Sequence, residues 1–145
     1  MILLQTKEKA FFDDDIISND GRLIYLEYTK YNVLKYLWDI FWVIRRNKYD
    51  VVHAHVYHFS GIVLLIAFLA GVKVRISHCH NDKSSNNKSA SKLKKCYNKI
   101  CVFLLEKLST KKIAVSKLAA HSLYQKYNNL EIIPCGLYFE DDMIY

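Results

Sequence analysis

Four histidines occur as two His-x-His pairs in this 145-residue sequence, and an imidazole can act as a base, a hydrogen-bonding group or a metal ligand. His53 and His55 close the run Tyr-Asp-Val-Val-His-Ala-His, while His78 and His80 close the run Val-Arg-Ile-Ser-His-Cys-His. Because successive side chains of a strand point to opposite faces, the two members of each pair share a face. The spacing therefore predicts two imidazole pairs at the ends of two strands.

The segment between the pairs predicts how they come together. Phe59–Gly71 is apolar and long enough for about three helical turns. It lies between two runs rich in β-branched residues, Asp50–His55 and Val74–Ser77, and strand, helix and strand make one βαβ unit. Parallel strands end at the same edge of a sheet, which is where open α/β sheets bind ligands. We therefore expect the four histidines to gather at a functional rim.

Strand and helix patterns also alternate along the rest of the chain. The expected strands are Met1–Leu4, Arg22–Glu27, Lys112–Val115 and Leu130–Ile133, and the expected helices are Glu8–Asn19, Asn32–Asn47, Leu93–Leu108 and Lys117–Lys126. This alternation is typical of an α/β fold with a mostly parallel sheet, which we expect to be centred on Asp50–His55. The polar segment Asp82–Ser91 predicts a surface loop.

The net charge of +7 is concentrated in one segment. Nine lysines and one glutamate lie between Lys83 and Lys112. Such a segment can attract phosphates, anionic lipid headgroups or nucleic acid, or can simply be the solvated face of a helix. No base-reading motif accompanies the lysines, so we expect no nucleic-acid partner, whereas peripheral contact with the inner-membrane surface is compatible with the charge.

The cysteines and the apolar segments indicate a cytoplasmic protein. None of the four cysteines forms a Cys-x-x-Cys motif and no signal peptide precedes them, so we expect buried free thiols at Cys79, Cys96, Cys101 and Cys135. Gly61–Gly71, the most apolar segment, falls short of the roughly 20 residues that a membrane-spanning helix needs. The first residues carry no targeting pattern.

Several motifs, in this order, resemble the N-terminal half of family 4 glycosyltransferases, most closely the bacterial capsule and exopolysaccharide branch: Tyr-Asp-Val-Val-His-Ala-His, Phe-Ser-Gly, Arg-Ile-Ser-His-Cys-His-Asn, Ile-Ala-Val-Ser-Lys and Ile-Ile-Pro-Cys-Gly. The resemblance implies one Rossmann-like half of a GT-B fold, with helices on both faces of its sheet. It also implies transfer of a sugar from a nucleotide sugar to a saccharide or lipid-linked acceptor, without a metal or another cofactor. In this family the N-terminal half holds the acceptor.

The sequence departs from the family at both ends. The family begins with a strand and a glycine-rich loop that approaches the donor phosphates, and this sequence has no counterpart of either. It also has no counterpart of the two glutamates, eight residues apart, that lie in the family's donor half. Cys135 stands where the family usually has asparagine. We therefore expect residues 1–136 to be an incomplete N-terminal domain, and residues 137–145 to begin a linker towards an absent donor domain. Such a fragment would be inactive alone.

The resemblance also implies the site residues. It places His80 at the cleft, where the imidazole can orient or deprotonate an acceptor hydroxyl, and Asn81 where its amide can bind sugar hydroxyls. We expect His55 to contribute to substrate binding and Gly136 to permit a backbone turn near the cleft. Ser116 is expected to cap the following helix, whose amides could then face a phosphate.

Two histidines have structural roles in this interpretation. We expect His53 to be buried support beneath His55, and His78 to have a structural role rather than a functional one.

Two alternatives remain open. The His-x-His pairs could hold zinc in a metal-dependent hydrolase, although the only nearby carboxylate is Asp82 and the chain is too short for the barrel of such enzymes. The chain could also be a non-catalytic remnant, or a subunit completed by a partner that carries the donor half.

Overall fold

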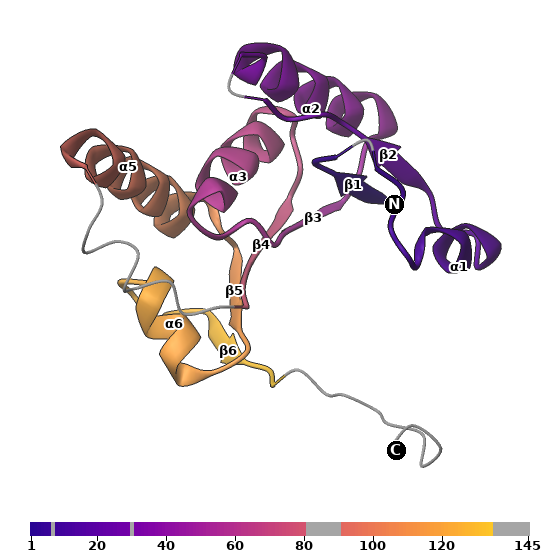
Figure 1. The fold of residues 1–145 in the computed structure, drawn as a ribbon. Coiled ribbons are helices and arrows are strands. Elements are labelled where there is room, and N and C mark those ends of the chain that lie inside the picture. Colours follow the sequence, from indigo (N-terminus) through magenta and orange to yellow (C-terminus); the bar gives the residue numbers. More distant parts are fainter. Residues whose placement is uncertain (7, 30, 81–90, 135–145) are drawn as a thin grey trace. The chain divides into compact units, whose positions relative to one another are not determined.

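The structure is a computed structural model that describes residues 1–6, 8–29, 31–80 and 91–134 (Figure 1). The chain divides into two compact units, Met1–Lys48 and Tyr49–Tyr145. Both units combine helices with strands that pair in parallel, which confirms the predicted α/β class.

The first unit contains two parallel strands and two helices: β1 (Ile2–Leu4), α1 (Asp13–Ser18), β2 (Leu23–Tyr25) and α2 (Val33–Asn47). Helix α2 differs from its predicted range only in its first residue. It ends at Lys48, which has the left-handed backbone conformation (φ 52°) common just after helices. The aromatic rings of Tyr28 and Tyr36 meet edge to face, with centroids 5.2 Å apart.

Helix α1 is shorter than the predicted Glu8–Asn19. It begins at Asp13, and three consecutive aspartates occupy its first turn, where the helix dipole favours negative charge. The Asp13 carboxylate accepts hydrogen bonds from the Ala10 backbone N–H (2.7 Å) and the Tyr25 hydroxyl (2.5 Å). These bonds hold the residues before Asp13 in a turn, so the apolar periodicity there does not become helix.

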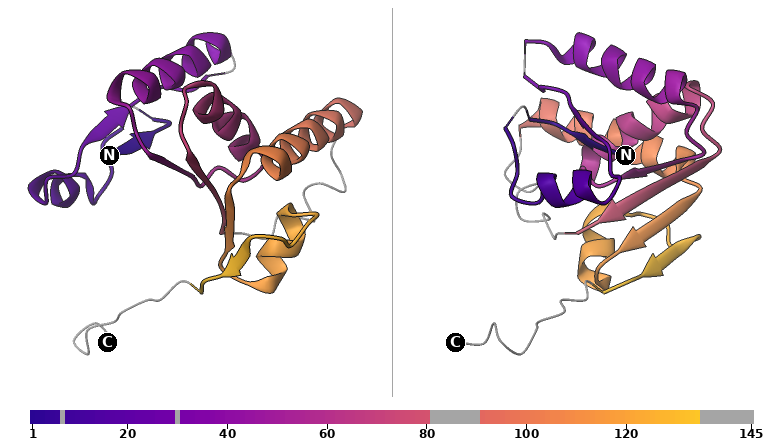
Figure 2. Two further views of the ribbon diagram at one scale, coloured as in Figure 1. Left: turned by 180° about the vertical axis from the view of Figure 1, so that it is seen from behind. Right: turned by 90° about the vertical axis from the view of Figure 1, so that its right-hand side faces the viewer.

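The second unit is built on a four-stranded parallel sheet in the order β3 (Val51–Ala54), β4 (Val74–Cys79), β5 (Lys111–Ala114) and β6 (Leu130–Ile132). Its strands run side by side in one direction (Figure 2). Every strand that the sequence predicted in this half is present. Parallel pairing puts the carboxyl ends of all four strands at one edge.

One prediction about this sheet is wrong. Asp50–His55 was expected at its centre, but β3 is one of the two edge strands of this four-stranded sheet and pairs with β4 alone in it. Periodicity identifies a strand and its buried face, yet it carries no information on which strands lie beside it. The lateral order depends on packing between distant segments.

The crossover from β3 to β4 begins with a short 3-10 helix, η1 (Tyr57–Phe59), and continues as α3 (Ser60–Leu69). Gly71 ends it in the left-handed region (φ 89°). The Gly71 N–H donates to the carbonyl of Phe68, and the Val72 N–H donates to that of Ala67, which is the Schellman pattern. The predicted glycine cap is confirmed.

Helix α3 packs closely against α5 (Lys92–Leu108). Gly61 lies at the closest point, since a Cβ atom added there would be 2.0 Å from the carbonyl oxygen of Cys101. The absence of a side chain at Gly61 therefore permits the two helix backbones to approach.

The interior of this unit is organised around Tyr124. Its side chain is 2% exposed, and its hydroxyl lies 2.9 Å from the carbonyl oxygens of both Ser77 and Ile113. These contacts join β4 and β5 to the residue that follows α6 (Lys117–Leu123). They explain why α6 ends three residues before the predicted Lys126, because Tyr124 leaves the helix in an extended conformation.

Lys112 does not belong to a solvated basic face. It is 2% exposed, and its ammonium group donates to the Glu106 carboxylate and the Lys126 carbonyl, each at 2.7 Å. Burial opposes ionisation of Glu106, but the bonds from Lys112 and from two backbone N–H groups outweigh it and lower the pKa of this carboxyl group. Among the described residues of the segment, the exposed lysines are those on α5: Lys92, Lys94, Lys95, Lys99 and Lys107.

The thiol prediction is confirmed in part. Cys79 and Cys101 are free and buried, whereas Cys96 is free but exposed. Cys135, the predicted loop between residues 82 and 90 and the predicted linker 137–145 lie outside the described residues.

The contact at Gly61 can be tested by the sign of a stability change. Helix propensity alone predicts that Gly61→Ala stabilises the chain by up to about 1 kcal/mol. We expect the opposite, a loss of about 1–3 kcal/mol, because the new methyl group overlaps the Cys101 carbonyl and forces α3 and α5 apart. Urea denaturation measures the difference. Leu69→Ala, at an exposed position of the same helix, is the control, and a more stable Gly61→Ala variant would contradict the described packing.

Candidate functional site

The four histidines of the two pairs form one cluster, as predicted. In the register of β3 on β4, His53 is the partner of Ile76 and Ala54 is the partner of Ser77. Continuing this register one residue places His55 beside His78. Ring centroids lie 4.1 Å apart within each pair and 5.0–5.2 Å apart between the pairs. We call these four residues, His53, His55, His78 and His80, the histidine cluster.

The opposite face of β4 explains why these rings point the same way. Ser77 and Cys79, which alternate with the histidines, are 0% and 1% exposed. The Cys79 thiol lies 3.2 Å from the Ala119 carbonyl, and the Ser77 hydroxyl lies 3.1 Å from that of Tyr124. Because these two side chains are anchored in the core, His78 and His80 must lie on the other face.

His55 and His80 are joined directly. The Nδ1 atom of His55 lies 2.7 Å from the Nε2 atom of His80, so one ring donates a hydrogen and the other accepts it. Both side chains are exposed, and they stand at the carboxyl ends of β3 and β4. The residues that the sequence singled out therefore form a linked pair open to solvent.

His53 corrects a prediction, because it is exposed rather than buried beneath His55. The reason is the position of β3 at the outside of its sheet, where a strand end is covered less than in the centre. His53 lies parallel to His78, with an interplanar angle of 8°.

The surroundings keep three of the imidazoles, those of His53, His55 and His78, neutral at pH 7. Loss of solvation lowers the pKa of His55 to about 4, and repulsion from His53 and His80 adds to the effect. The pKa of His78 is likewise lowered to about 4, by loss of solvation and then by the charges of His80 and His55. The pKa of His53 is lowered for the same kinds of reason. Neutral imidazoles have lone pairs available for protons or metal ions.

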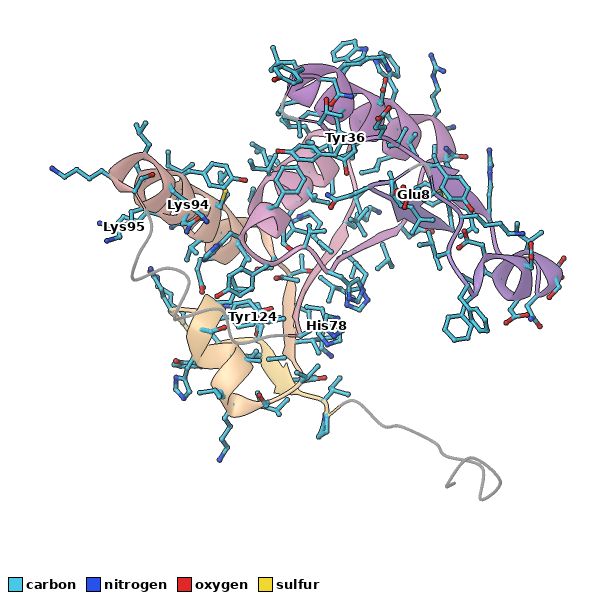
Figure 3. The ribbon with its side chains drawn as sticks, in the orientation of Figure 1. Glu8, Tyr36, His78, Lys94, Lys95 and Tyr124 are labelled. Carbon is cyan, nitrogen blue, oxygen red and sulfur yellow. The ribbon has the colours of Figure 1, made fainter. Side chains whose placement is uncertain are left out.

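His78 has an unusual environment. Both of its ring nitrogens are buried and have no hydrogen-bond partner among the described residues. Figure 3 shows its ring at β4 within a group of nitrogen-bearing side chains. Buried polar atoms are rarely left without a partner. Sequence patterns did not indicate this environment, since they predicted only a structural role for His78.

Three members of the histidine cluster also meet the spatial requirement for a metal site. His53, His55 and His78 can each offer a ring nitrogen such that the three atoms lie within 4.8 Å of one another. Within the described part of the chain, no carboxylate belongs to this group. Asp82, which the sequence indicated as a possible ligand, lies outside the described residues.

The remaining predicted site residues differ in outcome. Ser116 caps α6, since its hydroxyl accepts a hydrogen bond from the Ala119 N–H at 3.1 Å. Its predicted phosphate contact stays a prediction. Asn81 and Gly136 lie outside the described residues.

One residue near the cluster was missed from the sequence. Tyr57, two residues beyond His55, has a positive φ of 50°, which is uncommon for an aromatic residue. Its hydroxyl donates to the Ser122 carbonyl at 2.9 Å, and this bond fixes the chain where it leaves β3. No sequence signal distinguishes such a tyrosine from an ordinary core aromatic.

The chain is similar to a family model, to individual glycosyltransferases and to solved structures. The family model described as Glycosyltransferase Family 4 matches residues 4–140. The capsular polysaccharide biosynthesis glycosyltransferase CapH of Staphylococcus aureus is 31% identical over 116 residues, covering 80% of this chain and 32% of CapH. The putative glycosyltransferase EpsF of Bacillus subtilis is 38% identical over 81 residues, covering 54% of this chain and 21% of EpsF.

Among solved structures, Anabaena Alr3699/HepE in complex with UDP has a TM-score of 0.68 at 14% identity. The match covers 93% of this chain and 36% of that one. The same protein with UDP and glucose gives an equal TM-score. The chain thus spans about a third or less of the relatives and structures that it matches.

The lowered pKa values predict a pH-dependent loss of stability. Unfolded histidines bind protons near pH 6.5, whereas His55 and His78 do so only near pH 4 in the folded protein. The unfolded state therefore holds more protons in this interval, so the free energy of unfolding falls as the pH decreases from about 6.5 to 4.

NMR titration of imidazole resonances in chelator-treated protein, with urea denaturation at pH 7 and pH 5, would measure both effects. The variant His78→Gln should show a smaller decrease in stability between the two pH values. Midpoints near 6.5 for both His55 and His78 would contradict the described environment.

Proposed function

Because the chain belongs to glycosyltransferase family 4, we propose that it forms the acceptor-binding side of an enzyme for cell-surface polysaccharide synthesis. The reaction would transfer a sugar from a nucleotide sugar to a saccharide or lipid-linked acceptor. A donor-binding half, in the same polypeptide or in a partner subunit, would hold the nucleotide sugar. In this proposal the 145 residues alone are inactive, since a transferase works chiefly by holding two substrates together.

The relatives support this assignment. CapH is described as a glycosyltransferase of capsular polysaccharide biosynthesis, and the structural neighbour was solved with UDP and with UDP plus glucose. UDP is the nucleotide part of a common class of sugar donor. The same reaction class is our proposal for the completed form of this chain.

The observation that carries the proposal is the hydrogen bond between His55 and His80 at the carboxyl edge of the sheet. Loss of solvation lowers the pKa of His55 to about 4, so this ring is neutral at pH 7 and its Nδ1 can accept a hydrogen from Nε2 of His80. If His80 donates from Nε2, its Nδ1 carries a lone pair that can receive the proton of an acceptor hydroxyl. When His80 becomes positively charged, the bond to neutral His55 becomes charge-assisted and stabilises it.

The proposal assigns distinct tasks to the other residues. His80 is the catalytic residue, and His55 orients it and contributes to binding the substrate. Asn81 would hydrogen-bond sugar hydroxyls, Ser116 would support an anion-binding turn, and Gly136 would allow the chain to turn beside the cleft. These last three roles rest on the family resemblance.

A peripheral membrane contact is part of the same proposal, because lipid-linked acceptors lie at a membrane surface. The five exposed lysines of α5 provide positive charge along one helix, and Lys94 and Lys95 extend away from the ribbon in Figure 3. No helix in the described part of the chain is long and apolar enough to cross a membrane.

The role of His80 is testable in a completed enzyme, obtained by joining or co-expressing the chain with a donor-binding half. We expect His80→Ala to lower turnover about 10²–10⁴-fold, the usual contribution of a positioned acid–base group, and the 145-residue chain alone to show no transfer. Sugar transfer with chelator present, at matched folded concentration, is the measurement. His121→Ala is the matched control, because His121 is an exposed histidine of α6 that is hydrogen-bonded to the Tyr127 hydroxyl. Unchanged turnover in His80→Ala would remove this residue from the mechanism.

The membrane contact predicts salt-sensitive binding to anionic vesicles. Each lysine near the surface contributes about 1 kcal/mol, so Lys94→Gln combined with Lys95→Gln should weaken binding about tenfold or more. Co-sedimentation with phosphatidylglycerol vesicles at low and high salt measures this. The double variant Lys9→Gln with Lys35→Gln removes the same charge from residues that are not part of α5. Equal binding by the two double variants would assign the effect to net charge alone.

A further inference from the structure

The histidine cluster contains more imidazole groups than acceptor binding requires. His55 and His80 account for the proposed chemistry, while His53 and His78 have no task in it. His53, His55 and His78 are the three whose ring nitrogens lie within 4.8 Å of one another. Neutral rings placed this close together are an arrangement that suits a shared positive ion, because each ring can offer one nitrogen as a ligand.

His78 provides an independent reason to expect a ligand. Its two ring nitrogens are buried without a hydrogen-bond partner among the described residues, although one nitrogen of a neutral imidazole is a donor and the other an acceptor. A bound ion would supply the partner that the acceptor nitrogen needs.

We propose that His53, His55 and His78 form a binding site for a divalent transition-metal ion of the Zn²⁺ type. The inference goes beyond the proposed function, for which the family resemblance implied no metal. Imidazole ligands favour zinc, copper, nickel and cobalt over magnesium and calcium, which prefer oxygen ligands. No carboxylate among the described residues belongs to the group, so magnesium or calcium would lack its preferred ligands.

The geometry requires only side-chain movement. Zn–N bonds of about 2.0–2.1 Å in tetrahedral arrangement place ligand nitrogens about 3.4 Å apart. The observed limit of 4.8 Å must therefore shrink by about 1.4 Å, which rotations about the soft terminal torsion of histidine can provide. The ligands come from neighbouring strands held in one register, so the backbone is already in place. Two of the three ligands are exposed, which gives the ion access.

His80 would then act on the metal through His55. The Nδ1 atom of His55 contacts His80, which leaves Nε2 of His55 for the ion. A metal-binding imidazole commonly donates its other N–H to a neighbouring group, which fixes the ring. In this state His55 donates to Nε2 of His80, the reverse of the direction proposed for catalysis. The hydrogen of neutral His80 then lies on Nδ1, so bound metal would switch off the base; this consequence alone rests on the proposed function.

Metal binding can be measured without any sugar-transfer assay. We would treat the tag-free 145-residue chain with chelator, titrate it with Zn²⁺ by calorimetry, and record the absorption spectrum with Co²⁺. The expected result is one ion per chain, no binding of Mg²⁺, and a cobalt spectrum without the sulfur charge-transfer band that cysteine ligands produce. His78→Ala and His53→Ala should each weaken Zn²⁺ binding by at least about 100-fold, exceeding the 10–100-fold typical of outer-shell residues.

Two controls keep the test decisive. His121→Ala and Cys96→Ser remove an exposed histidine and an exposed thiol elsewhere, and both should bind Zn²⁺ like the parent. His78→Gln preserves size and polarity at the cluster, so a folded His78→Gln chain that fails to bind confirms that the imidazole is needed. The proposal would be overturned if the parent chain did not bind Zn²⁺, if His78→Ala bound Zn²⁺ as tightly as the parent, or if Cys96→Ser lost Zn²⁺ binding.

The outcome is separable from the fate of the proposed function. Calorimetry on the chain alone decides the metal site whether or not the completed enzyme transfers sugar. If the completed enzyme is active, Zn²⁺ should inhibit it and chelator should restore it, and His78→Gln should abolish that inhibition. Activity that requires Zn²⁺, rather than being inhibited by it, would overturn the proposed direction of the His55–His80 hydrogen bond.

Discussion

The candidate site depends on the parallel register of β3 on β4, in which each residue pairs with the one 23 positions later: Val51 with Val74, and Ala54 with Ser77. The two His-x-His pairs are 25 residues apart, which differs from this register by two residues. The pairs therefore lie on the same face of the sheet, with His55 directly beside His78. A crossover one residue longer or shorter would turn one pair to the other face of the sheet. The length of α3 and its sharp end at Gly71 therefore decide whether the four imidazoles meet at all.

Core packing enforces the same result from the other side of the sheet. Ser77 and Cys79 are buried and bonded to residues on and just after α6, so β4 cannot rotate without leaving polar atoms unpaired. Tyr124 ties β4 to β5, and the buried pair of Lys112 and Glu106 joins β5 to α5. The histidine cluster thus lies on strands whose inner faces are fixed. Its flexibility is confined to side-chain torsions, as a site that must bind and release a ligand requires.

The sequence was informative where local pattern decides structure. β-branched runs, an apolar segment and a glycine identified the βαβ unit, and this identification alone predicted the meeting of His55 and His80. It was less informative where distant contacts decide. The Asp13 carboxylate shortened α1, the lateral order of strands put β3 outermost and exposed His53, and Lys112 found Glu106 in the interior. None of these contacts produces a periodic pattern in the sequence, because each depends on which residues the fold brings together.

The hydrogen bond between His55 and His80 can be made in two directions, and each of our two proposals uses one of them. If Nε2 of His80 donates, Nδ1 of His80 keeps a lone pair that could receive a substrate proton. If Nδ1 of His55 donates instead, Nε2 of His55 keeps a lone pair that could bind a metal ion. The two arrangements differ in where two hydrogens lie. Because a ligand shifts such an equilibrium only by its preference for one state, an acceptor hydroxyl and a metal ion would compete through this single bond without contacting each other.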